Sequence, residues 1–278
     1  MKKIISFLFF VPLFASAQID STATDSIKTA PVHIRLRDRA TGKNIFKTNI
    51  SNISFNNYSL TYERLIAKKV SFAIGYRYMP FGVIPYSKQL QDASGNNPDV
   101  NFNLFKMGNM SITPEFRVYA HKNMRGFYFS FYGRYASFDM AIPIKYTTTA
   151  MGQPVTENAS FEGTIKSFSG GLMLGTQQNL GKHIVIDIWI VGLHAGSSNG
   201  TLQATFSPAL INAPIPPSGT NPVKSLQDAI NGIDATPFTV TGKVNLNPGG
   251  LTASSATLDC TGPWYGIRGL GINLGIRF

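Results

Sequence analysis

The chain has 278 residues, of which 43% are hydrophobic, 12% aromatic and only 14% charged, with a formal net charge of +11. Soluble domains carry about 25% charged residues, so this composition argues against an ordinary soluble enzyme, and its hydrophobic content argues against a disordered chain. The basic balance could suggest nucleic acid as a partner, but the export signal described next makes that partner improbable. The single cysteine, Cys260, excludes an internal disulfide.

The N-terminal residues 1–17 are predicted to be a secretory signal peptide. Lys2 and Lys3 form its positive region, residues 4–14 its apolar region, and Ala15-Ser16-Ala17 its cleavage site before Gln18. The apolar run is shorter than the ~20 residues that a spanning helix needs. Residues 18–43 lack strand alternation and predict a flexible N-terminal tail, and residues 44–278 form the folded domain.

Eight segments of the domain alternate between apolar residues and small or polar residues, the pattern of strands with one apolar face. They lie at about residues 46–51, 58–63, 70–78, 110–118, 127–135, 167–175, 184–191 and 270–278. In the seventh segment, Ile184, Ile186, Ile188 and Ile190 share the apolar face, and Asp187 lies on the other.

The connections alternate between short basic turns and long polar loops. The turns are predicted at 67–69, 121–126 and 181–183, and the long loops at 80–103, 143–163 and 195–262, with a short connection near 51–54. An even number of strands with this alternation places both termini on the same side of a membrane, as in single-chain outer-membrane barrels.

The last loop is long enough that a functional role or disorder is expected. Within it, Asn221-Pro222 predicts the N-cap and first residue of a helix. Apolar residues follow at helical spacing, at Val223, Leu226, Ala229 or Ile230, and Ile233. Gly232 is the expected end of this helix. A helix of about ten residues does not stand alone in water, so it must pack on the rest of the domain or on a partner. Residues 239–246 alternate weakly and suggest an additional hairpin.

The C-terminal strand carries the clearest alternation. Leu270, Ile272, Leu274, Ile276 and Phe278 alternate with glycine, asparagine and arginine. An amphipathic last strand ending in phenylalanine resembles the signal that the outer-membrane barrel-assembly machinery recognises, which implies an assembly role for Leu274, Ile276 and Phe278.

With the export signal, residues 44–278 resemble a small outer-membrane β-barrel of the Bacteroidetes type, broadly OmpA/OmpX-like and porin-like. The resemblance implies an all-β fold, an eight-stranded antiparallel transmembrane β-barrel in the Gram-negative cell outer membrane. It further implies a periplasmic tail, a long last extracellular loop containing the short helix, and outer-membrane lipid as a partner. Eight strands are counted, and ten remain an alternative. A soluble β-sandwich or lipocalin-like barrel would expose several apolar stripes to water, so the membrane barrel is favoured.

Charged residues gather on the predicted inward face. They are Lys47, Glu63, Arg77, Glu115, Arg117, Arg134 and Asp187. An eight-stranded barrel has room only for its own side chains, and a buried charge is costly unless it is paired. These residues therefore predict an ion-pair network that plugs the lumen, with a polar path for small solutes as the alternative.

No catalytic, cofactor or metal site is predicted. His194 with Ser197 and Ser198 could suggest a hydrolase, but residues three apart on a regular strand point to opposite faces, and no carboxylate follows in this segment before Asp228. The glycines at 266, 269 and 271 lie within a strand rather than between a strand and a helix, so they do not form a dinucleotide loop.

Three classes of function remain open at this point. The first is a non-enzymatic outer-membrane barrel with a structural or interaction role through its extracellular loops and an unknown partner. The second is a lipid-modifying enzyme that hydrolyses or transfers acyl chains of lipid A, and the third is a narrow channel or an accessory subunit of an uptake or secretion complex. The basic turns, which include Lys68, Lys69, Lys122, Arg125 and Lys182, are expected near anionic lipid head groups.

Overall fold

A computed structural model describes residues 42–94, 101–150, 153–205, 222–232, 237–246 and 253–278. The expected signal peptide and all but the last two residues of the expected tail lie outside these ranges. The strands are β1 (Asn44–Asn49), β2 (Tyr58–Ala67), β3 (Val70–Val83), β4 (Lys106–His121), β5 (Arg125–Ala150), β6 (Gln153–Leu180), β7 (Ile184–Thr205), β8 (Thr239–Leu246), β9 (Ala253–Pro263), β10 (Gly266–Arg268) and β11 (Gly271–Arg277). The helices are η2 (Ile53–Phe55), α1 (Ser87–Ala93) and α3 (Pro222–Asn231).

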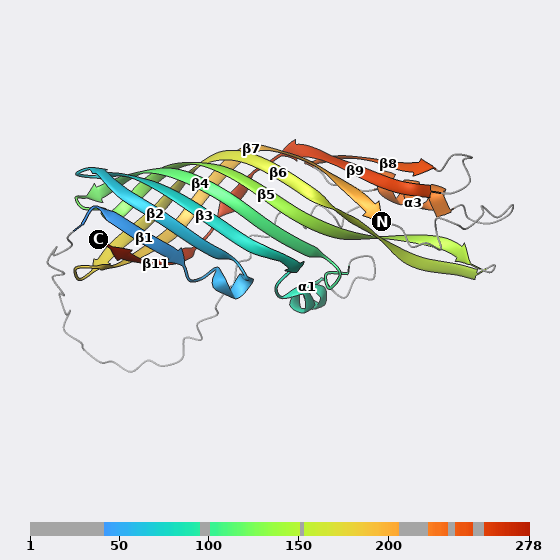
Figure 1. The fold of residues 1–278 in the computed structure, drawn as a ribbon, viewed down its shortest axis with the longest axis horizontal. Coiled ribbons are helices and arrows are strands. Elements are labelled where there is room, and N and C mark those ends of the chain that lie inside the picture. The colour runs from blue at the N-terminus through green and yellow to red at the C-terminus, as the bar shows by residue number, and fades with distance from the viewer. Residues whose placement is uncertain (1–41, 95–100, 151–152, 206–221, 233–236, 247–252) are drawn as a thin grey trace, which may run out of the picture.

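All described strands belong to one antiparallel sheet, and eight of them close into a ring (Figure 1). Strands β1 to β7 are neighbours in chain order, and β11 pairs with both β7 and β1. At the closure, the backbone N–H of Asn44 donates to the Phe278 carbonyl at 3.0 Å, and the Phe278 N–H donates to the Asn44 carbonyl at 2.9 Å. The eight segments expected to be strands are the eight strands of this ring.

The three short turns expected from the sequence lie together at one end of the ring, where β11 also ends (Figure 1). They connect β2 to β3, β4 to β5, and β6 to β7. In the β4–β5 turn, Asn123 and Met124 have φ values of 61° and 51°, the left-handed backbone that tight turns use. This end is called the turn end below.

The expected long loops 143–163 and 195–262 are an error of the sequence prediction, because most of their described residues are strand. Strands β5 and β6 continue as a hairpin to Ala150 and Gln153, and β7 continues to Thr205 and pairs with β9, which pairs with β8. Residues 138–150, 153–166 and 195–205, together with β8, β9 and α3, are called the distal extension below. The expected loop 80–103 likewise contains the end of β3 and helix α1.

Helix α3 packs against β5 and β8 in the distal extension. Its residues Leu226 and Ile230 are buried in an apolar cluster that includes Phe161, Leu202 and Leu258. The Gln227 side chain fixes the helix to β8, since its Nε2 donates to the Gly242 carbonyl at 3.1 Å and its Oε1 accepts from the Val244 N–H at 3.0 Å. The expected N-cap, Asn221, lies outside the described residues. Among the described residues, no helix is long and apolar enough to cross a membrane.

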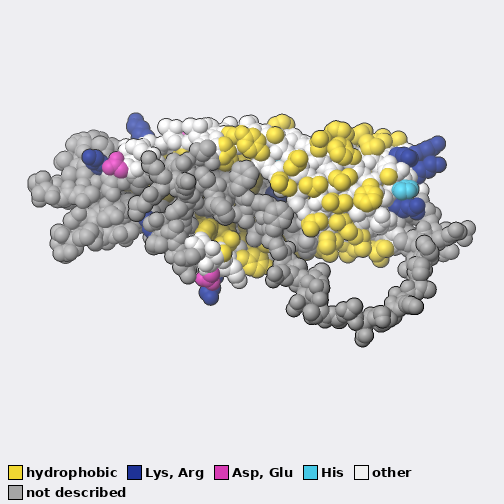
Figure 2. Space-filling view, turned by 180° about the vertical axis from the view of Figure 1, so that it is seen from behind, with side chains coloured by type: hydrophobic (Ala, Val, Ile, Leu, Met, Phe, Trp, Pro, Cys, Tyr) yellow, Lys and Arg dark blue, Asp and Glu magenta, His cyan; other side chains and the backbone are white. Residues whose placement is uncertain are grey.

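The ring has an apolar outer surface and a polar interior. Every ring strand presents a large apolar side chain that is 40–60% exposed. One from each strand is Phe46, Leu60, Ile74, Ile112, Phe129, Leu172, Leu193 and Leu274. On the face that Figure 2 shows, hydrophobic side chains gather over the half next to the turn end. On the inner face, every ring strand buries a polar side chain to 2% exposure or less. One from each is Lys47, Glu63, Ser71, Arg117, Ser130, Gln177, Asp187 and Asn273.

A β-bulge in β7 corrects the expected outer face of that strand. Leu174 pairs with Val191 and Gly175 pairs with Trp189, so Ile190 has no partner on β6. An extra residue in one strand reverses the faces that follow it. Val191 and Leu193 are therefore exposed on the outer surface, and the expected outward run of isoleucines ends at Ile188 rather than at Ile190.

Candidate functional site in the interior of the ring

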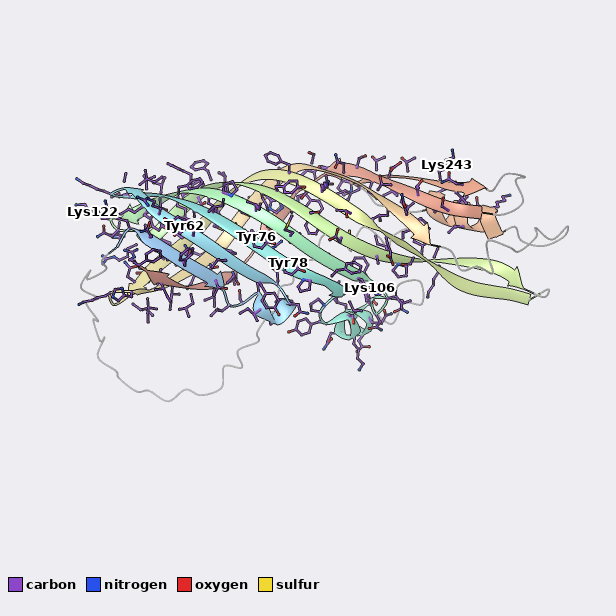
Figure 3. All side chains as sticks on the ribbon, viewed as in Figure 1. Tyr62, Tyr76, Tyr78, Lys106, Lys122 and Lys243 are labelled. Carbon is purple, nitrogen blue, oxygen red and sulfur yellow. The ribbon has the colours of Figure 1, made fainter. Side chains whose placement is uncertain are left out.

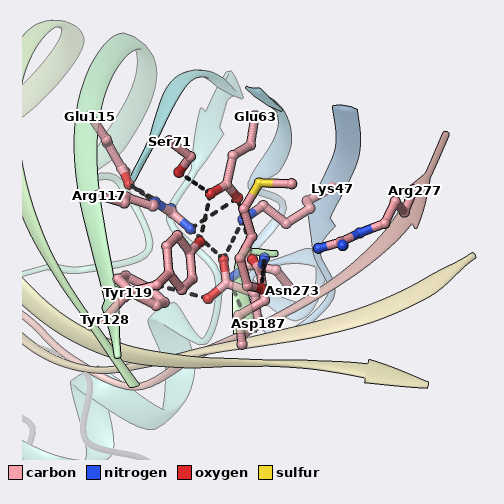
Figure 4. A network of polar contacts seen from close by, with 12 residues as sticks. Lys47, Glu63, Ser71, Glu115, Arg117, Tyr119, Tyr128, Asp187, Asn273 and Arg277 are labelled. Atoms are coloured by element: carbon pink, nitrogen blue, oxygen red, sulfur yellow. Dashed lines mark hydrogen bonds and ion pairs between the residues drawn. The ribbon is translucent and has the colours of Figure 1, made fainter. Parts of the chain in front are cut away.

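Lys47 lies at the centre of a buried polar cluster near the turn end (Figure 4). Its Nζ donates to Glu63 Oε2 at 2.5 Å and to Asp187 Oδ2 at 2.6 Å, and to Gln177 Oε1 at 2.9 Å. These four side chains come from four different strands, and each is at most 2% exposed. A buried charge is tolerated when it is paired and hydrogen-bonded, and Lys47 meets both conditions.

Arg117 on β4 extends this cluster across the ring. Its Nη1 lies 2.8 Å from Asp187 Oδ2, and its Nη2 lies 2.5 Å from Glu115 Oε2. The other oxygen of Glu115, Oε1, lies 3.0 Å from Nη1 of Arg268 on β10. Because Arg117 and Lys47 share Asp187, the two cations and their partners form one connected set.

Hydroxyl groups donate to the second oxygen of Glu63 and of Asp187. The Tyr119 hydroxyl donates to Glu63 Oε1 at 2.5 Å, and the Ser71 hydroxyl donates to the same oxygen. The Tyr128 hydroxyl donates to Asp187 Oδ1 at 2.7 Å, and the Arg117 guanidinium lies 4.7 Å from the centre of the Tyr128 ring. Each buried carboxylate therefore has a partner on both of its oxygens.

These six charged residues, named the ion-pair network here, contain equal numbers of cations and carboxylates. The cations are Lys47, Arg117 and Arg268, and the carboxylates are Glu63, Glu115 and Asp187. The network joins β1, β2, β4, β7 and β10 through the middle of the ring. Its charges compensate one another, and each of its carboxylate oxygens has a partner.

Arg77 and Arg134 were expected in the same network, and the structure does not bring them into it. The Arg77 guanidinium donates through Nε and Nη2 to Asn109 Oδ1 at 3.2 and 2.9 Å. Arg134 Nη2 donates to the Ser111 hydroxyl at 3.1 Å. Among the described residues, neither arginine forms an ion pair with a carboxylate, so both hydrogen-bond only to neutral acceptors.

The sequence interpretation missed Arg268, because it began the last strand near residue 270. Arg268 lies on the short strand β10, opposite Gly192 on β7. Its guanidinium lies 3.8 Å from the centre of the Trp189 ring and 5.4 Å from that of Tyr132. Ile267 is exposed on the outer surface, but it lies three residues from Leu270, so the alternation changes phase between β10 and β11. Extending the pattern of the last strand would have placed Arg268 on the outer face, so the sequence held no signal for its inward direction.

The residues considered for catalysis do not assemble into a catalytic arrangement. His194 Nδ1 lies 3.4 Å from the Tyr132 hydroxyl, with the donor set by the tautomer. Ser197 lies on the opposite, exposed face of β7, as expected, and the Ser198 hydroxyl donates to the Gly262 carbonyl at 3.3 Å. Within the described ranges, no group of three or more His, Cys, Asp and Glu residues could hold a metal ion.

The outer surface carries its charges at the two ends and tyrosines between them. Figure 3 shows Lys122 at the turn end, Lys243 in the distal extension, and Tyr62, Tyr76 and Tyr78 along the ring between them. The side chains of Lys68, Lys69, Lys122 and Lys182 are exposed at the turn end. Basic side chains are visible there in Figure 2, beyond the edge of the hydrophobic half.

The chain matches one protein family over residues 30–196, the family described as "protein of unknown function (DUF3575)". The chain belongs to this family. The matched residues include β1 to β6 and the part of β7 that lies in the ring, with five of the six members of the ion-pair network, and they end before Arg268. No curated protein and no solved structure matches the chain.

Proposed function

We propose that this member of the DUF3575 family is an integral outer-membrane β-barrel. The observation that carries the proposal is the inverted polarity of the ring. Each of its strands exposes a large apolar side chain, whereas Lys47, Glu63, Glu115, Arg117 and Asp187 are buried inside. Membrane barrels have an outward apolar band and a polar interior, and a closed sheet leaves no unpaired backbone edge in lipid. In water, the same surface would be a large exposed apolar patch.

The two ends of the ring support one orientation in this membrane. Membrane barrels have short turns on the periplasmic side and longer extracellular connections. The three short turns would therefore lie in the periplasm, where their exposed lysines can approach anionic lipid head groups. The distal extension would lie outside the cell. Tyr76 and Tyr78, exposed on the outer surface of β3, suit the aromatic girdle at a membrane interface.

The role that we propose for the barrel is structural or interactive, with the distal extension as the surface that meets an extracellular partner. The ion-pair network supports this role, because its paired side chains occupy the interior of the ring. The distal extension is then the large surface that is available to a partner. The barrel-assembly machinery and outer-membrane lipid are the partners that a barrel of this kind requires.

The test is the location and gel behaviour of the full chain. The protein should fractionate with the outer membrane, begin at Gln18 after export, and migrate differently on a gel before and after heating. Folded barrels resist the detergent until they are heated, and this produces the difference in migration. A native protein that stays in solution without detergent would contradict the proposal.

A narrow channel is the second candidate function, and one observation favours it. A cavity of about 30 Å³ lies in the ring interior beside Arg77 and Arg134. Planar-bilayer recordings separate the two functions, because a barrel closed by the ion-pair network should show no steady conductance. A steady conductance typical of general porins would favour the channel.

A further inference from the structure

The interior of the ring holds a second group of charges whose balance differs from that of the ion-pair network. The cavity of about 30 Å³ is lined by Arg77, Arg134 and Arg268, and Glu115 is the one carboxylate on its wall. Both oxygens of Glu115 are already engaged, one by Arg117 and the other by Arg268. With three arginines and one carboxylate, the lining carries an excess of positive charge.

The two arginines outside the network supply this excess. Arg77 and Arg134 donate to the amide oxygen of Asn109 and the hydroxyl oxygen of Ser111. These acceptors satisfy some of the guanidinium N–H groups but carry no charge. Arg134 and Arg268 also repel the Arg77 guanidinium. Arg77 and Arg134 are half-buried, and neighbouring cations without a counter-charge are costly in proportion to their burial. An anion held between them would lower that cost.

A second, independent feature of the same cavity is a buried donor without an acceptor. Trp189 lines the cavity and is 7% exposed. Its indole Nε1 has no hydrogen-bond partner among the described residues. Buried donors are nearly always paired with protein, water or an ion, so this N–H group of a lining residue calls for a partner other than the described side chains.

We propose that this cavity binds a small inorganic anion, with chloride as the probe. Its charge selects an anion, because Arg77 and Arg134 have no carboxylate partner there. The cavity of about 30 Å³ exceeds the roughly 10–15 Å³ that holds one water, so it has room for a small inorganic anion. Hydroxyl groups of Thr61, Ser111 and Thr113 complete a polar wall. The bound anion would neutralise Arg77 and Arg134, as the carboxylates of the ion-pair network neutralise its cations.

The experiment measures chloride binding to the full folded chain in detergent, with gluconate replacing chloride at constant ionic strength. The line width of free chloride in chlorine NMR should show a saturable excess broadening when the protein is present. The temperature of unfolding should rise with chloride over the same range, because a ligand that binds only the folded state stabilises it.

The deciding variant is Arg77→Gln with Arg134→Gln, which should weaken chloride binding by at least about tenfold, since hydrogen bonds to charged groups are the strong ones. The matched control is Lys68→Gln with Lys122→Gln, which removes the same charge from the exposed turns and should leave binding unchanged. No saturable broadening with the unmutated protein, or an equal loss in both double variants, would overturn the proposal.

A separate measurement keeps the test decisive if the arginine variant does not fold. In the Trp264→Phe protein, fluorescence reports only Trp189, since the chain has 2 tryptophans. Chloride should change that fluorescence with the same saturation as the NMR signal, and a fluorescence independent of chloride would also overturn the proposal. An anion inside the ring does not require a surrounding membrane, so this outcome is distinct from the membrane fractionation above.

Discussion

The ring and the distal extension bury opposite kinds of side chain. In the ring, Gln177 on β6 is buried inside and the neighbouring Leu174 is exposed outside. Farther along the same strand, Phe161 is buried inside and Glu162 is exposed outside. The backbone continues without a break between the two parts, while the kind of side chain that it buries changes. The ring follows the rule of a membrane barrel, and the extension follows the rule of a sheet in water.

The largest expected effect comes from breaking the ion-pair network. Arg117→Met should destabilise the ring by about 3–5 kcal/mol, because removing one member of a buried ion pair leaves an uncompensated charge. Unfolding by denaturant in lipid vesicles measures the loss. Lys166→Ala is the control in the distal extension, where the exposed lysine should contribute within about 0.5 kcal/mol. Equal losses would mean that the network is not the buried centre of the ring.

The corresponding test of the distal extension removes apolar volume instead of charge. Leu226→Ala should cost about 2–5 kcal/mol within the extension, because Leu226 is fully buried between α3 and the strands. Limited proteolysis should then cleave the extension while the ring remains intact. Asp228→Ala on the exposed side of α3 is the control and should leave the proteolysis pattern unchanged. Cleavage of the ring at the same rate would show that the two parts do not unfold separately.

A third pair of variants compares the two outer surfaces directly. Ile74 lies between Phe72 and Tyr76 on the exposed face of β3, and Ile74→Arg should cost about 2–4 kcal/mol if this face lies in lipid. Gln203→Arg places the same side chain on the exposed face of the extension, where it should be neutral. Refolding yields and unfolding in vesicles measure both. If the two variants are equally tolerated, the ring surface does not face lipid.

The same contrast explains how far the sequence could be interpreted. The ring strands were predictable because their outer surface repeats large apolar residues at nearly every second position. The extension was taken for loops because its apolar residues, such as Phe161 and Ile165, lie on the inner face, and the outer positions are Thr, Lys and Glu. The inward direction of Lys47 and Asp187 was predictable from alternation, but their contact joins residues 140 positions apart, and only the closure of the ring brings them together.

The smallest expected effect concerns the seam where the ring closes. The Phe278 ring stacks on Phe46 with centroids 5.6 Å apart, and such a pair contributes about 0.5–1.5 kcal/mol beyond its buried area. Phe278→Ala should therefore lower the stability of the refolded protein by about that amount. If Phe278 also serves the assembly machinery, the amount of protein in the outer membrane should fall more than this modest loss explains. Phe127→Ala is the control, because Phe127 is an exposed outer aromatic close to the same end of the ring without a place at the seam. An equal fall in membrane level for both variants would remove the assembly role and leave Phe278 as a packing residue.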